Sequence, residues 1–225
     1  MCGRFTQRAD RKALLKSFAV AEVPHLEPRY NIAPTQDVLG VHQSPDGREA
    51  TFFKWGLVPS WAKDTSMSAR LINARSETVA EKPAFRQAFK QRRCIIPADG
   101  FYEGQRTEGR KQPFFFRMRD ERSFGFAGLW EHWEGEGGKV INSFTILTTE
   151  ANEVLRPVHD RMPVILHPED YELWLGAGAR ELDLVKEMLR PYTSGEMVGY
   201  PVGVAVNSPR NQGAGLIERA AVNSA

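Results

Sequence analysis

Residues 92–104 read RRCIIPADGFYEG and contain two short apolar runs divided by a proline, an aspartate and a glycine. The first run carries two adjacent isoleucines and the second two adjacent aromatic residues, and both types favour β-strands. Pro97 and Gly100 mark a turn between the runs. The stretch therefore predicts a strand, a turn and a second strand, with no helix between them.

The segments on both sides repeat this pattern of strands joined by turns. Apolar runs predict further strands at 52–61, where the strand runs into a turn, and at 111–119, 123–133, 141–149 and 161–168. Amphipathic spacing predicts helices at 10–19, 83–91, 149–158, 168–175 and 179–190. Proline-rich residues 23–36 form an extended loop, and residues 200–213 form a turn-rich tail. Because helices interrupt the strands irregularly, we expect a mainly antiparallel α+β fold, with a single domain over residues 1–225.

The composition limits the class of protein but does not name a partner. The chain has 225 residues, and its 30 Lys and Arg exceed its 28 Asp and Glu by two, which neither requires nor excludes nucleic acid. Its apolar runs are shorter than the ~20 residues that span a bilayer, and no signal-peptide pattern is present. Two cysteines make no disulfide framework. We expect a soluble, cytoplasmic protein with no membrane attachment.

Sequence motifs for metals and nucleotide phosphates are missing. The histidines lack the HExxH arrangement and the His/Cys spacing of zinc sites. No GxxxxGK[ST] or GxGxxG motif occurs, and the glycines of EGEGG at 134–138 are expected in a hairpin turn. We therefore expect chemistry without a metal or a cofactor.

Several polar residues stand in unusually apolar surroundings. Such residues can be solvated strand ends or packed histidines, or they can supply an acid, a base and an orienting amide. Together they resemble the set of a Cys-His-Asn hydrolase. The candidates are Asn73, Arg75 and Glu77 in LINARSET, Asp99 and Glu103 in PADGFYEG, and His159, Asp160 and Arg161 in VHDR.

The two cysteines differ in what their positions allow. Cys94 lies between charged and branched apolar residues and is expected to be a buried strand residue. Cys2 has no preceding helix to lower the pKa of its thiol, which disfavours an ordinary thiol hydrolase. It can simply be a frayed chain end. If Met1 is removed, however, Cys2 carries an α-amine beside its thiol. The amine can condense with an aldehyde, and the thiol can then close a thiazolidine ring, an intramolecular step with a large effective concentration.

Four motifs decide between these alternatives. They are MCGRF at 1–5, NAR followed by Glu77 at 73–77, PADGFYE at 97–103 and HDRMP at 159–163. In this order they resemble the SOS-response-associated peptidase (SRAP) family, and weaker matches run along nearly the whole chain. The resemblance implies a barrel-like β core with peripheral helices. It also implies a DNA-damage protein that captures abasic sites in single-stranded DNA through a thiazolidine between its N-terminal cysteine and the opened sugar.

The resemblance also assigns roles to individual residues. Cys2 is the expected nucleophile, and Asn73 is expected to position the amine and the sugar. Glu103 is expected to transfer protons during Schiff-base formation, and His159 to assist ring opening and reversal. Many family members have a bulky aromatic residue after this glutamate, whereas this chain has Gly104, which leaves room beside Glu103.

Contacts with DNA follow from the same resemblance. We expect phosphate contacts from three arginines and a threonine, stacking on bases by two aromatic residues, and a pocket wall from two further residues. For Trp61 a place in the core is an equal alternative, and packing alone can explain the wall residues. The residues are Arg4, Arg75, Arg161 and Thr148 for phosphates, Trp61 and Phe85 for bases, and Asn31 and Pro34 for the wall.

Two further activities remain open from the sequence. The same residues can make a thiol peptidase limited to removing Met1 from its own chain, and this is compatible with capture. A non-covalent single-stranded DNA-binding protein is the other alternative, and it would leave Cys2 unimportant. We expect a monomer that associates with the nucleoid when it is bound to DNA.

Overall fold

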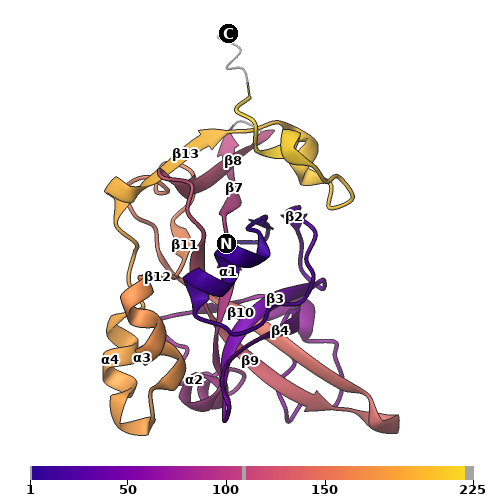
Figure 1. Ribbon diagram of the computed structural model, residues 1–225. Helices are drawn as coiled ribbons and strands as arrows, with labels where there is room; N and C mark the ends of the chain where they lie inside the picture. The colour runs from indigo at the N-terminus through magenta and orange to yellow at the C-terminus, as the bar shows by residue number, and fades with distance from the viewer. Residues whose placement is uncertain (1, 108–109, 221–225) are drawn as a thin grey trace.

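The computed structural model describes residues 2–107 and 110–220 (Figure 1). The stretch 92–104 forms two strands, β6 (Arg93–Ala98) and β7 (Gly100–Thr107), which belong to different sheets and do not pair with each other. Asp99 alone separates them. Its carboxylate accepts hydrogen bonds from the backbone N–H of Arg8 and, at 2.6 Å, from Oγ of Ser123. The predicted turn is therefore a joint between two sheets rather than a hairpin.

Five strands of the larger sheet close into a barrel. β3 pairs with β4 and β6, β6 with β9, β9 with β10, and β10 with β4, which completes the circuit. The β10–β4 contact is parallel and the others are antiparallel. The barrel-like core is thus confirmed. The strands other than β6 are β3 (Asp37–Ser44), β4 (Gly47–Trp55), β9 (Phe124–Glu134) and β10 (Val140–Glu150).

Three short strands extend the barrel beside the end of β10. β5 (Asn73–Arg75) runs parallel to β10, and β11 (Arg161–Pro163) runs antiparallel to it. Thr148 of β10 is in register with Arg75 on one edge and with Pro163 on the other. β12 (Ile165–Leu166) pairs with β9. Residues from two distant motifs, NAR and HDRMP, are therefore brought to either side of one strand.

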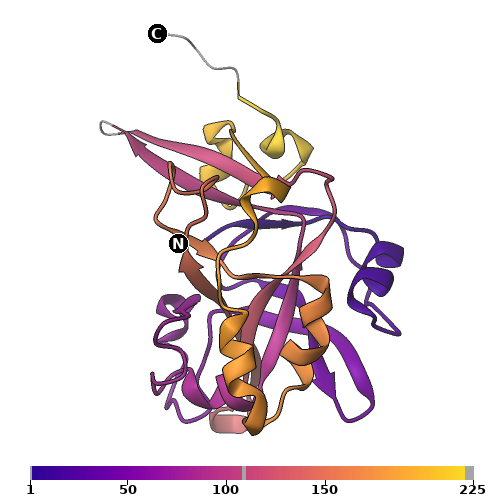
Figure 2. The ribbon, with the colours of Figure 1, turned by 90° about the vertical axis from the view of Figure 1, so that its left-hand side faces the viewer.

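The second sheet carries the N-terminal end of the chain and has the order β13-β8-β7-β1-β2. Gly100 at its joint with the barrel has no room for a side chain, because an added Cβ would lie 2.2 Å from Cζ of Phe115. In both ribbon views this sheet lies at the opposite end of the molecule from helices α3 and α4 (Figures 1 and 2). Its strands besides β7 are β1 (Phe5–Gln7), β2 (Arg29–Ile32), β8 (Arg110–Met118) and β13 (Met197–Pro201).

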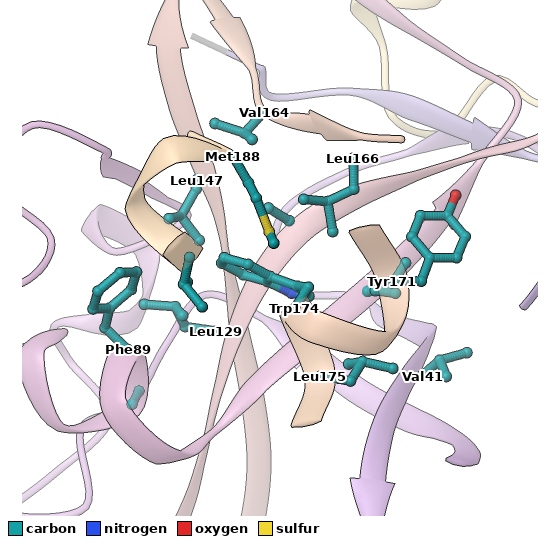
Figure 3. Close-up of a cluster of buried hydrophobic side chains, with 14 of the residues drawn as sticks. Val41, Phe89, Leu129, Leu147, Val164, Leu166, Tyr171, Trp174, Leu175 and Met188 are labelled. Carbon is teal, nitrogen blue, oxygen red and sulfur yellow. The ribbon is translucent and has the colours of Figure 1, made fainter. Parts of the chain in front are cut away.

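Four short helices cover the barrel and share a hydrophobic cluster with it. Figure 3 shows Trp174 of α3 amid Leu129, Leu147 and Met188. Among the described residues, no helix has the length and apolar character needed to cross a membrane. The helices are α1 (Arg11–Phe18), α2 (Arg86–Gln91), α3 (Tyr171–Gly176) and α4 (Leu182–Glu187). Short 3-10 turns lie at Ser68–Arg70, Glu136–Gly138, Pro168–Asp170, Ala179–Glu181, Ser194–Glu196, Val204–Asn207 and Ala214–Ile217.

A buried arginine fixes two of these helices on the barrel. Arg93 of β6 donates hydrogen bonds to the carbonyls of Trp174 and Phe89 at 2.5 and 2.7 Å, and also to those of Lys90 and Ala177. These carbonyls lie at the C-terminal ends of α2 and α3, where the last turn leaves oxygens without partners in the helix. Hydrogen bonds and the negative ends of the two helices thus compensate the buried charge.

Three predicted elements differ in the structure. The loop expected at 23–36 contains strand β2. The helix expected at 149–158 is a series of turns, because β10 continues through Glu150 and Pro157 ends any helix after it. In the remaining segment the Asn152 side chain accepts a hydrogen bond from the Leu155 N–H at 3.1 Å, which favours a turn. The strand expected at 161–168 is divided into β11 and β12.

Candidate functional site

Cys2 lies in the interior and is not a frayed end. The strand that follows it, β1, is held between β2 and β7, with Phe5 paired to Ile32 and Phe101. Cys2 is 0% exposed, and its Sγ lies 3.9 Å from the carbonyl oxygen of Arg4. Burial raises the pKa of the Cys2 thiol far above its usual range, and the negative charge of Glu103 raises it further. In this environment the thiol stays protonated.

Asn73 is the residue that holds Cys2 in place. Its Nδ2 donates a hydrogen bond of 2.9 Å to the carbonyl oxygen of Cys2, while its Oδ1 is buried and makes no hydrogen bond within the described part of the chain. The preceding loop is fixed to the barrel by hydrogen bonds from Trp55 Nε1 to the Ile72 carbonyl and from the Leu57 N–H to the Leu71 carbonyl. An oriented amide with a spare acceptor therefore lies beside the cysteine.

Glu103 lies on β7, the neighbour of β1, and is buried. Its carboxylate is close enough to Cys2 for its charge to act on the thiol. It also lines a cavity of about 340 Å³ whose wall includes Gly104, a residue with no side chain to fill that space. The other lining residues are Gly3, Arg4, Tyr102, Pro113, Val206 and Asn207.

His159 lies in the turn that leads into β11. Its Nδ1 accepts a hydrogen bond from the Arg161 N–H at 2.9 Å and lies 2.9 Å from Oδ1 of Asp160. The preceding Pro157 carbonyl accepts a 2.9 Å hydrogen bond from Nε2 of Gln105, two residues beyond Glu103 on β7. The histidine turn is therefore tied to the strand that carries the glutamate.

The side chains of Arg161 and Thr148 are both largely shielded from solvent. The guanidinium of Arg161 binds the carboxylate of Glu77 with both terminal nitrogens, and Nη2 also donates to the Thr148 carbonyl at 2.6 Å. Thr148 is buried, and its hydroxyl donates to the Ala74 carbonyl at 3.4 Å. In this structure the Thr148 hydroxyl is enclosed by the two strands beside β10, and the expected contact with a phosphate stays a prediction.

Arg4 and Asn31 join the N-terminal strand to the far end of the chain. Arg4 donates hydrogen bonds to Asn31 Oδ1 at 2.9 Å and to the Val206 carbonyl at 2.8 Å. Asn31 is buried and donates to the carbonyls of Val206, Ser208 and Asn211. Arg4 therefore lines the cavity with its guanidinium engaged by these partners, whereas Asn31 supports Arg4 and is not among the lining residues.

The remaining candidates separate into exposed and buried residues. Trp61 is 59% exposed on the loop before Asn73, and Arg75 is also exposed. Phe85 is packed into the cluster under α2, and its expected stacking on a base stays a prediction. Pro34 is half-buried in the turn after β2 and does not line the cavity beside Glu103.

The sequence did not predict several residues that shape the site. Tyr102, Pro113, Val206 and Asn207 line the cavity. The segment VNSPRNQG at 206–213 matches the family, which was a signal that it lies near the site. Its contribution is made largely through backbone carbonyls, which no side-chain pattern reveals. Within the described ranges, no three His, Cys, Asp or Glu side chains gather where they could hold a metal ion.

Comparisons with known proteins agree with this architecture. A family model described as SOS response associated peptidase (SRAP) matches residues 1–209. The chain is 40% identical to the abasic site processing protein YoqW of Bacillus subtilis (strain 168), over 97% of this chain and 99% of that protein. It is 33% identical to the abasic site processing protein YedK of Escherichia coli (strain K12), over 97% and 99% of the two chains. A solved structure of a Bacteroides thetaiotaomicron protein superposes with a TM-score of 0.83 at 26% identity, covering 96% of this chain and all of that one (100%). The chain therefore belongs to the SOS-response-associated peptidase family.

Proposed function

We propose that, once Met1 is removed, the protein captures abasic sites in single-stranded DNA covalently. The α-amine of Cys2 adds to the C1′ aldehyde of the opened sugar, and the resulting carbinolamine loses water to give an imine. The Cys2 thiol then adds across the C=N bond, so that a C–S bond forms and the nitrogen gains the thiol proton. Amine, thiol and aldehyde become thiazolidine and one water, and no oxidant or reductant is needed.

The observation that carries the proposal is the set of groups around Cys2. A buried cysteine lies next to a buried carboxylate and has its carbonyl held by Asn73, and that carboxylate and Gly3 line a cavity of about 340 Å³. The names of its relatives, abasic site processing proteins, point to the same substrate class. An electrophile in the cavity would meet the carboxylate of Glu103, with the amine and thiol of Cys2 next to it.

Each polar residue has a step that suits its surroundings. Glu103, buried beside the thiol, can protonate the leaving hydroxyl of the carbinolamine and later accept the thiol proton. Asn73 orients the end of the chain through the carbonyl of Cys2, and its Oδ1 can accept a hydrogen bond from the amine or the sugar. His159, fixed through Nδ1, is assigned to opening of the sugar ring and to reversal.

The surroundings of Cys2 favour capture over peptide hydrolysis. A thiol peptidase needs a thiolate, and burial together with Glu103 raises the pKa of this thiol. Addition to an imine can proceed from the protonated thiol with the neighbouring carboxylate as proton acceptor. Removal of Met1, whether by this chain or by another enzyme, precedes the reaction in either case.

Contacts with the DNA backbone are assigned to the arginines around the end of β10. Arg75 is exposed on β5, and Arg161 lies across the same strand on β11. Trp61, more than half exposed on the adjacent loop, can stack on a base. Binding is then expected to tolerate any sequence and to weaken with salt.

The test uses tag-free protein whose mass confirms the loss of Met1. It is mixed with a single-stranded oligonucleotide that has one abasic site, and the products are separated on a denaturing gel. We expect an SDS-resistant band that needs the lesion, persists in Cys94→Ala and disappears in Cys2→Ala. A band that persists in Cys2→Ala, or no band with the native protein, would overturn the proposal. Non-covalent binding by Cys2→Ala would then identify a simple DNA-binding protein.

A further inference from the structure

Arg161, assigned above to a DNA phosphate, already has an anionic partner in the protein. Its Nη1 binds Oε1 of Glu77, and its Nη2 donates to Oε2 at 3.0 Å. A carboxylate held by both terminal nitrogens matches the way in which a guanidinium holds two phosphate oxygens. Glu77 therefore occupies the face of Arg161 that a phosphate would use.

The two partners of this pair are anchored very differently. The side chain of Arg161 is 13% exposed, and the Thr148 carbonyl holds its Nη2 at 2.6 Å. The side chain of Glu77 is 52% exposed. If the pair opens, water can solvate the carboxylate at once, while the guanidinium stays where the barrel holds it. Glu77 is thus the partner that can leave.

The neighbouring positive charges attract a phosphate and the Glu77 carboxylate alike. Arg75 is exposed on β5, two residues before Glu77, and adds positive charge to the same surface. The hydrogen bond and charge of Arg161 hold the pKa of Glu77 below its usual range, so this carboxylate is ionised at neutral pH. An arriving phosphate therefore competes with a full negative charge.

We propose that Glu77 sets the affinity for DNA by occupying Arg161 until a backbone phosphate displaces it. The inference rests on the proposed function, because it takes Arg161 as a phosphate ligand. The free energy gained when Arg161 binds a phosphate is then only the difference between its interaction with the phosphate and its interaction with Glu77. Binding to undamaged strands is weakened, whereas a captured lesion is retained by its covalent bond. Glu77 in this way determines specificity for the lesion without touching it.

The experiment measures non-covalent binding, in a Cys2→Ala background, to a fluorescein-labelled undamaged single strand by anisotropy. Glu77→Gln keeps the size of the side chain and removes its charge. The matched control is Glu150→Gln, which removes one exposed negative charge at the residue that pairs with Arg161 in the β10–β11 register. Arg161→Gln and the double variant Glu77→Gln/Arg161→Gln complete a double-mutant cycle for this ion pair.

We expect Glu77→Gln to bind about three- to tenfold more tightly at low salt, because a partly buried bidentate pair is worth more than an exposed one. Glu150→Gln should change the affinity by less than about twofold. The gain should vanish in the Arg161→Gln background. The slope of log affinity against log salt should steepen by about 0.7 in Glu77→Gln, as for one additional phosphate contact with a single strand.

Other outcomes would overturn the inference. Weaker binding by Glu77→Gln would mean that the carboxylate positions Arg161 for DNA, and equal gains in Glu77→Gln and Glu150→Gln would mean a general charge effect. Thermal unfolding identifies any variant that has lost its fold, and Glu77→Ala then replaces Glu77→Gln. Covalent capture is measured separately with Cys2 present. Loss of capture with the Glu77 gain intact overturns only the proposed function, whereas capture without that gain overturns only this inference.

Discussion

Cys2 and Cys94 are alike in exposure and different in everything that surrounds them. Both are fully buried, and burial raises the pKa of both thiols. Cys94 lies in the barrel wall, paired with Gly128 on β9, and its carbonyl accepts a 2.9 Å hydrogen bond from Trp174 Nε1. Cys2 lies beside the carboxylate of Glu103 and the amide of Asn73, and its neighbour Gly3 lines the cavity. Because burial is common to both cysteines, the polar neighbours are what distinguish the proposed nucleophile from the structural cysteine.

The largest expected effect distinguishes the two acids of PADGFYE, Asp99 and Glu103, as a structural and a reactive residue. Glu103→Gln should slow covalent capture by about 100-fold or more, because a positioned proton-transfer group is lost. Asp99→Asn should leave the capture rate of folded protein near that of the wild type. It should lower the free energy of unfolding by about 1–3 kcal/mol, since its carboxylate joins Arg8 and Ser123.

Single-turnover capture on gels, together with urea unfolding, would measure both effects for the two acids. Equal slowing of capture by Glu103→Gln and Asp99→Asn would break the distinction between a reactive and a structural carboxylate.

A second prediction tests how tightly the barrel encloses Cys94. A Cβ added at Gly128 would lie 2.8 Å from Cys94 Sγ. Gly128→Ala should therefore lower the free energy of unfolding by about 1–3 kcal/mol, and combination with Cys94→Ala should recover at least about 1 kcal/mol of it. Gly176→Ala, where an added Cβ meets nothing within 4 Å, is the control. Strictly additive losses in urea unfolding would show that this sulfur is not enclosed as described.

The smallest effect is a pH dependence. A thiol whose pKa is raised in the folded state contributes fully to stability at pH values below its pKa in the unfolded chain, which is about 8.5. As the pH rises above that pKa, the contribution to the free energy of unfolding is lost. Above this value Cys94 should reduce the free energy of unfolding by up to about 1.4 kcal/mol per pH unit. The destabilisation caused by Cys94→Ala should therefore shrink between pH 8.5 and 10. A constant difference between the two unfolding curves would contradict the burial effect.

The sequence predicted strands better than it predicted their partners. The run CIIPADGFYEG marked β6 and β7, but only the closed barrel decides that these strands separate into two sheets. β5 has three residues and no pattern of its own, and it exists because β10 offers a free edge. The helix predicted at 149–158 does not form, because the pairing of β10 with β11 extends through Glu150.

The candidate site shows a similar division. Cys2, Asn73 and Glu103 could be found from motifs, and the structure brings these three residues together. The places of Phe85 and Thr148 could not be predicted, because exposure is decided by the packing of distant elements. The pairing of Glu77 with Arg161 joins residues 84 positions apart, which local patterns do not reveal.

The hydrogen bonds of Arg4 have a consequence for the order of events during synthesis. Arg4 emerges first from the ribosome, yet one of its partners, Val206, lies 202 residues later in the chain. At about 5–20 residues per second, roughly 10–40 s pass before this partner exists. Throughout that interval the pocket around Cys2 is incomplete. Residues 2–4 are therefore accessible while the protein is still being made, and they become enclosed only after residues 206 and 207 have been added.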